Sequence, residues 1–470
     1  MIRKGWMRMK RLSSGNIEQI LHGSLFRAML SIAVPVVVTS FLQTLYNLTD
    51  TYWLGRIGTE PLAAINLVTP VQNIVINFGS GVTVAGSVMV AQYIGANRWE
   101  DAKKIANQIF TCAMLFSATC ALLLSVLTPS IVAWLGAEGE VLRHGVSYLR
   151  IVILDMPFLF CVNIYQATRQ AQGDTVRPML LNLIGILTNM LLDPLFMVVM
   201  HMEATGAALA TVLAKVVPAG FALMLLLRRR ERIHLDYRVM RPERQNLRDI
   251  VRIGLPTAFG GSVMQLGFLL MSRTVFTYGT QAMAAYGIGN KVNGIISLPS
   301  NGIGSAVSTI VGQNMGAGQP ERAEKGYRMS MACAVAFLFV GGMILSAPPI
   351  SRAIVGIFSD EAEVIDMAAA FLSTMAFWCW TNGVHDSTVG LFQGTGHTEV
   401  TMTVNMCRLW VFRFATLFFC EHVLHLGVSS VWYSVVVSNG ISSAILIVLY
   451  LLGGWRKPRF KVRDARDERG

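Results

Sequence analysis

The sequence predicts an all-α polytopic membrane protein in which twelve transmembrane helices form two six-helix lobes related by pseudo-two-fold symmetry. Two observations lead to this fold class. Of the 470 residues, 53% are hydrophobic and only 14% are charged, whereas soluble domains carry roughly 25% charged residues. In addition, the second half of the chain repeats the residue pattern of the first half.

Apolar segments long enough to cross a bilayer, which takes about 20 residues per helix, recur along the chain. Helices are the element expected here, because irregular backbone cannot face lipid with its polar groups unsatisfied. Windows of this length predict six helices in each half, starting near Phe26, Leu62, Ile105, Gly145, Pro178 and Gly206, and near Ile250, Met283, Tyr327, Val364, Glu399 and Gly427.

The internal repeat keeps its register over polar and glycine positions. The stretch "VPVVVTSFLQTLYN" around Pro35 parallels "LPTAFGGSVMQLGF" around Pro256, and the same offset carries "VAQYIGA" onto "VGQNMGA". Further on, "QAQGDT" at Gln170 matches "QGTGHT" at Gln393 with a small drift. Because each repeat holds an even number of helices, both have the same orientation, as in parallel repeats around an axis along the membrane normal.

The charge distribution predicts the topology. The net charge is +12, and the basic residues concentrate in the N-terminal segment 1–24, the linker 228–246 and the tail 453–470. These segments flank the N-lobe 25–227 and the C-lobe 247–452 and fall on one side of the membrane. Positive residues favour the cytoplasmic side, so we expect a multi-pass protein of the cell (inner) membrane with both termini cytoplasmic. This charge is interpreted as topology and contact with the lipid bilayer, and no nucleic-acid partner is expected.

Ionisable residues lie well inside the predicted helices, where they usually face a bundle interior or a wet cavity and mark ion or substrate paths. The alternative is that acids and bases merely pair with one another. The acids are Asp50, Asp155, Asp193 and Asp386, and the bases are Lys215, Arg273, Lys291, Arg408 and Arg413.

The stretch "NMLLDPLF" is a candidate cation site. Asn189 and Asp193 are four residues apart and therefore share one helix face, while Pro194 frees a backbone carbonyl of the preceding turn. If Asp50 approached this face, two carboxylates would compete for a single positive charge in a poorly solvated site. Such a site suits a proton or a small cation. Pro35, on the same helix as Asp50, is either a hinge or an ordinary packed kink.

The doubled architecture, together with "YNLTDTYWLGRIGTEPLAA", "VAQYIGANRWEDA", "RQAQGDT" and "NMLLDPLFM", resembles the multidrug and toxic compound extrusion (MATE) transporters over roughly residues 25–452. The resemblance implies export of small amphiphilic, often cationic substrates, with H⁺ or Na⁺ as coupling ion and no other cofactor. It also implies a cation-coupling site formed by Asp50, Asn189, Asp193 and Thr211 with Tyr46 beside them, the first four being possible Na⁺ ligands.

The second lobe departs from the branch of this family that uses acids there. Met264 and Gln265 stand where that branch has a glutamate, and Asn382 stands at the position of its aspartate, with Asp386 one turn further on. The chain is therefore closest to the DinF-like branch, with coupling through the N-lobe. A possible C-lobe substrate cavity comprises Asp386, Asn382, Gln265 and Met264. The bases of this lobe are expected to pair or to reach an interface, although a base-lined cavity would suit anionic or zwitterionic amphiphiles.

Two alternatives differ from an exporter. A flippase for lipid-linked saccharides or other anionic amphiphiles shares this broad architecture, and the basic second lobe favours it slightly. An intramembrane enzyme is disfavoured, because the sequence contains no motif such as H-E-x-x-H. Nothing suggests ATP hydrolysis as the energy source, because no G-x-x-x-x-G-K-[ST] loop occurs. No catalytic residue and no structural metal site are predicted. A monomer suffices, since the repeat supplies both lobes.

Overall fold

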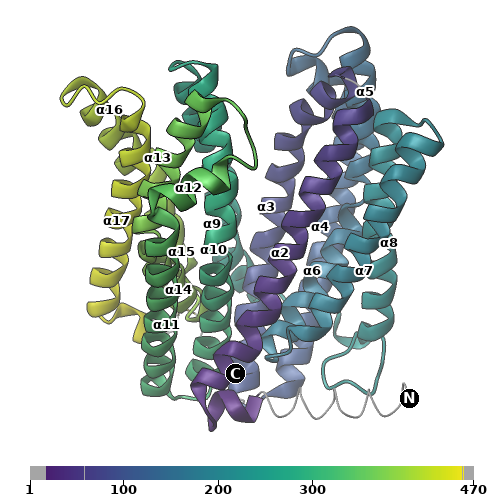
Figure 1. Ribbon diagram of the computed structural model, residues 1–470. Coiled ribbons are helices and arrows are strands. Elements are labelled where there is room, and N and C mark those ends of the chain that lie inside the picture. The colour runs from purple at the N-terminus through teal and green to yellow at the C-terminus, as the bar shows by residue number, and fades with distance from the viewer. Residues whose placement is uncertain (1–16, 58, 458, 460–470) are drawn as a thin grey trace, which may run out of the picture. The chain divides into compact units, whose positions relative to one another are not determined.

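The computed structural model describes residues 17–57, 59–457 and 459, which form helices joined by short connections (Figure 1). The chain divides into two compact units. Unit 1 comprises residues 17–21 and Val38–Phe259, and unit 2 comprises His22–Val37 and the described residues from Gly260 onwards. The unit boundaries at Val38 and Gly260 therefore fall inside helices and not in the connection between the two expected lobes.

The first half of the chain forms the helices of the first repeat. They are α2 (Leu25–Ile57), α3 (Thr59–Gly95), α4 (Trp99–Trp134), α5 (Gly139–Ile153), α6 (Met156–Ala171), α7 (Val176–Pro194), the π-helix η1 (Leu195–Val199) and α8 (Glu203–Leu226). A short 3₁₀ turn, η2 (Tyr237–Val239), lies in the connection to the second half.

The second half follows the same order. Its elements are α9 (Arg244–Phe276), α10 (Thr280–Gly316), α11 (Pro320–Ser346), the short α12 (Pro348–Val355), α13 (Ala362–Trp378), α14 (Trp380–Gly394), α15 (Thr398–Met406), the π-helix η3 (Cys407–Arg413), α16 (Phe414–His422), α17 (Ser429–Leu451) and η4 (Gly454–Arg456). Helix α9 begins at Arg244, inside the segment expected to be linker.

The predicted all-α membrane fold is confirmed. Within the described residues, nine helices are long and apolar enough to cross a membrane, and two bent helix pairs raise this number to eleven. The continuous run α15–η3–α16, Thr398–His422, occupies the place of the remaining helix. These elements correspond in order to the twelve helices predicted from hydropathy.

The repeat extends to helix lengths and irregularities. Helices α2 and α9 both have 33 residues, and α3 and α10 both have 37. The fourth helix of each half is bent at a short break, by 42° between α5 and α6 and by 53° between α13 and α14. The fifth helix of each half contains a π-helical stretch. Breaks shared by both halves indicate that these irregularities belong to the architecture.

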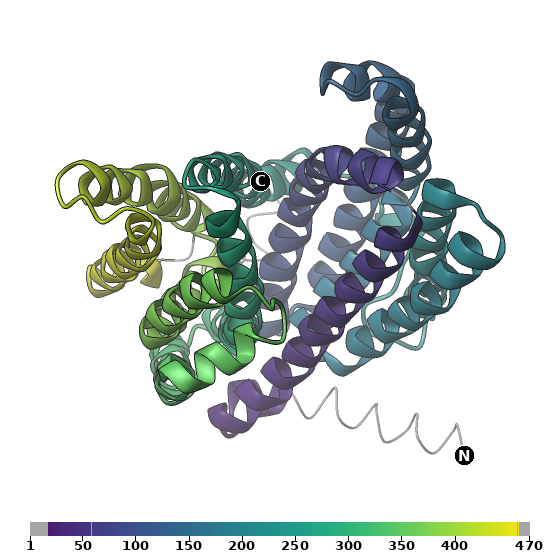
Figure 2. The ribbon, with the colours of Figure 1, turned by 45° about the horizontal axis from the view of Figure 1, so that its top comes forward.

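Glycines set the closest helix contacts beside the polar positions. A Cβ on Gly185 of α7 would lie 2.8 Å from the carbonyl oxygen of Ala214 in α8, and these helices lie side by side in Figure 1 and Figure 2. In unit 2, a Cβ on Gly304 of α10 would lie 2.6 Å from the Asp386 carbonyl oxygen of α14. Small residues let the backbones of membrane helices approach closely, and here they bring polar side chains within contact.

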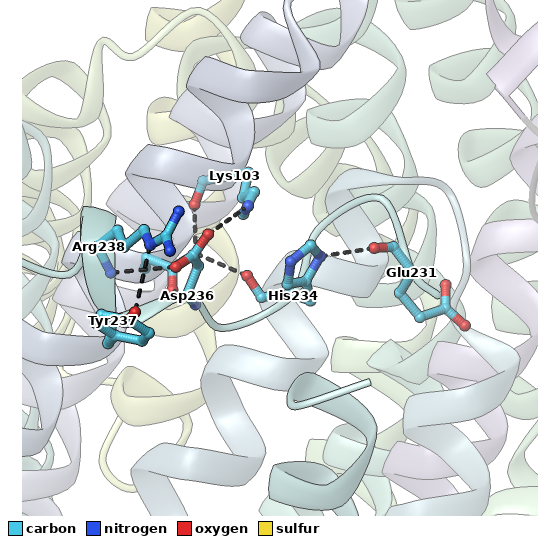
Figure 3. A network of polar contacts seen from close by, with 7 residues as sticks. Lys103, Glu231, His234, Asp236, Tyr237 and Arg238 are labelled. Atoms are coloured by element: carbon cyan, nitrogen blue, oxygen red, sulfur yellow. Dashed lines mark hydrogen bonds and ion pairs between the residues drawn. The ribbon is translucent and has the colours of Figure 1, made fainter. Parts of the chain in front are cut away.

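The connection between α8 and α9 is tied to unit 1. The buried Asn107 of α4 donates to the His234 carbonyl at 2.9 Å and accepts from the Asp236 N–H at 2.7 Å. Lys103 Nζ lies 2.9 Å from Asp236 Oδ2 (Figure 3). The Glu231 carboxylate forms ion pairs with Arg169 Nη1 of α6 at 3.0 Å and with Arg177 Nη1 of α7 at 3.2 Å. The expected linker is therefore held against three helices of this unit.

Candidate functional site

Three helices of unit 1 each contribute a pair of polar residues spaced by four, so that each pair shares one helix face. Helix α2 contributes Tyr46 and Asp50, α7 contributes Asn189 and Asp193, and α8 contributes Thr211 and Lys215. This set contains all five residues of the predicted cation-coupling site.

The structure brings these five residues together. The Tyr46 side chain is in polar contact with Thr211 and interacts electrostatically with Asp50 and Asp193. The two carboxylates, from α2 and α7, also interact with one another. Tyr148 of α5 lies beside the same group and interacts with both acids. Two carboxyl groups are therefore held at close range, and an added positive charge would offset the repulsion that arises when both are ionised.

Asp193 is the most enclosed member of this set. Its exposed fraction is 0%, and that of Asn189 is 1%. The Asn189 side chain is in polar contact with Asp193, but within the described residues none of the side-chain oxygens of the two residues completes a hydrogen bond of good geometry. Buried polar groups without partners are rare in folded proteins and call for an explanation such as an ion site. These hard oxygens are of the type that binds hard cations.

The backbone next to Asp193 is irregular. Helix α7 ends at Pro194, which has no N–H to donate, and the π-helical stretch η1 follows directly. Stretches of π-helix are rare and occur frequently at functional sites. The irregularity thus lies immediately after the candidate ion-binding acid.

A small polar cavity adjoins the site. Its volume is about 40 Å³, which exceeds the roughly 10–15 Å³ that a cavity needs in order to hold a water molecule. Its polar lining comprises Gln43, Tyr46, Asn163, Asn182, Asn189 and Lys215. Tyr46 and Asn189 belong to both the cavity lining and the acid site, so the cavity adjoins the acids through these two residues.

The same unit also contains an acid–base pair. Asp155 stands at the break between α5 and α6 and is buried. It interacts electrostatically with Lys215 of α8, which lines the cavity. This pair fits the alternative stated for the intramembrane charges, in which an acid and a base merely pair with each other.

Unit 2 contains a separate polar cluster around the other intramembrane acid. The buried Ser300 of α10 donates to Asp386 Oδ2 at 2.5 Å and also contacts the Asn382 carbonyl at 2.9 Å. Asn439 of α17 donates to Asn382 Oδ1 at 3.4 Å. Asp386 interacts electrostatically with Arg408 of η3. Asp386 and Asn382 of the predicted C-lobe cavity therefore lie in one network.

The other two predicted cavity residues lie apart from this network. Met264 packs against the apolar core cluster of unit 2 that includes Met271, Leu409 and Trp432. Gln265 is half-buried, and within the described residues it has no hydrogen bond to the Asp386 cluster. The four residues of the predicted C-lobe cavity are thus divided: Asp386 and Asn382 share a polar network, whereas Met264 and Gln265 lie outside it.

The exposed bases behave differently from the buried ones. Arg273 and Lys291 are both exposed, as expected for long side chains that reach out of an apolar region. Arg408 is half-buried and Arg413 is buried. Of these four bases, only the two arginines of η3 therefore add positive charge to the interior of unit 2.

The order of elements, the doubled pattern and the buried acids can be compared with known proteins. The MatE family model matches residues 35–195 and 256–419, one match in each repeat. The chain belongs to the MATE family of transporters. Assignment to its DinF-like branch remains a prediction from the second-lobe residues.

Relatives and solved structures of MATE proteins are similar over almost the whole chain. The probable multidrug resistance protein NorM of Thermotoga maritima is 24% identical over 453 residues, covering 94% of this chain and 96% of NorM. A crystal structure of MATE in complex with MaL6 superposes with a TM-score of 0.88 at 25% identity, covering 93% of this chain and 99% of that one. A MOP superfamily transporter from Pyrococcus furiosus, for which a reversed polarity of the binding pocket suggests a different function, has a TM-score of 0.86 at 25% identity and covers 93% of this chain and 97% of that one.

Sequence reasoning missed several polar residues of this MATE protein. Tyr148 lies beside the acids of unit 1, and Ser300 and Asn439 join the Asp386 network. One usable signal was the row of serines Ser434, Ser438 and Ser442 in α17, spaced by four within an apolar helix. Such spacing places small polar side chains on one helix face and marks the face that packs inside the bundle.

Proposed function

We propose that this MATE protein is a secondary antiporter that exports amphiphilic, often cationic drugs in exchange for H⁺ or Na⁺. The observation that carries the proposal is the pairing of Asp50 and Asp193 in one enclosed site next to a water-sized cavity. The name of the T. maritima relative, a probable multidrug resistance protein, supports the substrate class.

The coupling follows from competition for positive charge. With the site empty, the two carboxylates repel each other, and their residual hydrogen-bonding capacity is unused. Binding of H⁺ or Na⁺ between Asp50, Asn189, Asp193 and Thr211 relieves the repulsion and draws α2 and α7 together. Tyr46, one turn before Asp50, stabilises the same arrangement through Thr211. A membrane potential supplies about 2.3 kcal/mol per charge per 100 mV for this step.

Pro35 is the proposed hinge. Helix α2 runs through Pro35 without a break, and it passes from unit 2 to unit 1 at Val38, just after the proline. A proline lacks the N–H that would bond the preceding turn, so bending there disrupts few backbone contacts. Occupation of Asp50 can in this way alter the shape of the helix that belongs to both units.

The topology completes the proposal. Both termini lie in the cytoplasm, the chain sits in the cell (inner) membrane, and the basic segments 1–24, 228–246 and 453–470 face the cytoplasm. A monomer carries both repeats and suffices for transport.

The test is transport by purified protein in liposomes with one gradient imposed at a time. We expect either the proton or the sodium gradient to accelerate ethidium movement, and the ion that does so is the coupling ion. Transport that responds to neither gradient would reject antiport.

A second candidate is a flippase for lipid-linked saccharides or another anionic amphiphile. The observation in its favour is the excess of arginine inside unit 2, and the P. furiosus neighbour described with a reversed pocket polarity adds support. Resistance of expressing cells to dyes favours the exporter, whereas rescue of envelope-precursor translocation favours the flippase.

A further inference from the structure

The π-helical stretch η3, Cys407–Arg413, carries both interior arginines of unit 2. A π-helix forms hydrogen bonds between residues five apart, so Arg408 and Arg413, which have this spacing, are turned towards similar directions. The two guanidiniums are close enough to repel each other electrostatically. A stretch of rare geometry thus gathers two like charges in one part of the unit.

Arg413 is held by neutral groups. Its exposed fraction is 5%. Nε donates to the Ser438 hydroxyl at 3.2 Å, and Nη2 donates to Asn439 Oδ1 at 3.3 Å. The guanidinium also lies 6.0 Å from the centre of the Phe268 ring. These contacts orient the side chain, and none of them neutralises its charge.

The charge balance around the pair is positive. Within the described residues, Asp386 is the acid that interacts with Arg408, and Arg408 Nε is buried without a hydrogen-bond partner. Within the described part of unit 2, the ion pairs are made by Arg328, Arg352, Arg456 and Arg459. An arginine stays protonated in proteins, so both positive charges are permanent, and the Asp386 carboxylate interacts with one of them, that of Arg408. A buried charge without a counter-charge is costly, and a bound anion would remove that cost.

The equivalent helix of the first repeat has the opposite charge. Because "QAQGDT" at Gln170 parallels "QGTGHT" at Gln393, the run α7–η1 corresponds to α15–η3–α16. The first run carries Asp193 next to its π-helical stretch, and the second carries Arg408 and Arg413 within its own. The same irregular helix therefore presents an acid in one unit and two bases in the other.

We propose that Arg408 and Arg413 bind the anionic oxygens, carboxylate or phosphate-like, of an amphiphilic substrate. This inference rests on the proposed export function and defines one part of its substrate class. Guanidiniums suit such oxygens because their planar fork can donate two parallel hydrogen bonds. Phe268 lies beside Arg413, where it can contact the apolar body of the same molecule.

The test compares norfloxacin, which has a carboxylate, with its methyl ester, which has the same rings and amine but no carboxylate. Binding to purified protein in phosphatidylcholine nanodiscs is measured without any ion gradient. We expect the wild type to prefer the acid and Arg413→Gln to weaken acid binding by about ten- to hundredfold, as expected for the loss of one charged hydrogen bond. Ester binding should remain unchanged.

Matched variants separate charge from structure. Arg273→Gln removes an exposed positive charge from α9 and should leave both affinities unchanged. Arg413→Lys keeps the charge but not the fork and should give an intermediate loss. Asp386→Asn removes the competing carboxylate and should strengthen acid binding. Gel filtration of each variant identifies any that fail to fold, and Arg408→Gln then replaces Arg413→Gln.

Equal affinity of the wild type for acid and ester, or an equal loss of both in Arg413→Gln, would overturn the proposed anion subsite. A second arm adds phosphatidylglycerol to the nanodiscs. If this lipid lowers acid affinity in the wild type and not in Arg413→Gln, a lipid headgroup is a natural source of the anion; an unchanged affinity assigns the site to the exported substrate. The nanodisc binding assay applies no ion gradient. Its result can therefore be interpreted even if the liposome assay detects no antiport.

Discussion

Asp193 of α7 interacts electrostatically with Asp50 of α2, and the deeper acid is fully buried while the other is half-buried. The burial of Asp193 removes water that would otherwise screen the pair. Asn189, Thr211 and Tyr46 surround the two acids with oxygen and amide groups. In the proposed mechanism, a positive charge bound between these two acids therefore changes how α2 packs within unit 1.

Neutral, isosteric replacement of either acid should abolish coupled transport. We expect Asp50→Asn and Asp193→Asn to reduce ethidium or norfloxacin efflux from everted vesicles to the background of vesicles without the protein. The physical reason is that an amide cannot exchange H⁺ or attract Na⁺ as a carboxylate does. Immunoblots should find expression unchanged.

Two further variants control this prediction. Asp366→Asn removes an exposed acid that is paired with Arg352, and efflux should stay at the wild-type level. Asp386→Asn should have a smaller effect than either N-lobe variant, since it lies in the other unit. Full efflux in Asp50→Asn or Asp193→Asn would reject the coupling role, and an equal loss in Asp386→Asn would show that both units couple.

Close packing of α7 on α8 should be sensitive to one methyl group. In Gly185→Ala the new Cβ lies 2.8 Å from the Ala214 backbone oxygen, so the helices must separate. Overpacking of this kind costs about 1–3 kcal/mol, and it displaces Asn189 one turn further along α7. We expect a lower apparent Tm in detergent, read from tryptophan fluorescence, together with reduced efflux.

The matched control is Gly220→Ala in α8, where a Cβ would meet no atom of the described residues within 4 Å. Alanine is favoured over glycine in a helix by up to about 1 kcal/mol, so this variant should keep or slightly raise the Tm. If the two alanine variants behaved alike, steric contact at Gly185 would not be the cause.

The sequence predicted what depends on local periodicity and missed what depends on packing. Twelve apolar segments and the repeat were visible, as was the shared helix face of Asn189 and Asp193. The π-helix η1 follows a proline, whereas η3 contains none. The local sequence therefore gave no indication of the π-helix η3. The contact between Ser300 and Asp386 joins helices far apart in the chain and depends on the close approach at Gly304, which composition does not reveal.

Loss of the Glu231 carboxylate should destabilise unit 1. Glu231 contacts Arg169, which is 1% exposed, and Arg177. Removing one partner from a buried ion pair typically costs about 3–5 kcal/mol. We therefore expect Glu231→Gln to lower the apparent Tm clearly and to increase proteolysis between α8 and α9. Glu140→Gln, which affects an exposed pair with Arg143, should change stability by less than about 1 kcal/mol; equal shifts would contradict the assignment.

The contact between Asp236 and Lys103 should make stability depend on pH in the acid range. The hydrogen bond from Lys103 and, to a lesser extent, that from the Arg238 N–H lower the pKa of Asp236 below its ordinary value. A lowered folded-state pKa contributes stability that is fully present above the unfolded value of about 3.9 and is lost as pH falls through the folded value.

Asp236→Asn should therefore have a lower Tm than the wild type near neutral pH, and the difference should shrink below about pH 4. The measurement is the apparent Tm of both proteins in detergent across this range. In a Lys103→Met background the main cause of the lowered pKa is gone, so Asp236→Asn should produce a smaller difference that varies little with pH. A Tm difference that is constant down to the lowest pH, or undiminished without Lys103, would show that this ion pair does not control how the connection docks on α4.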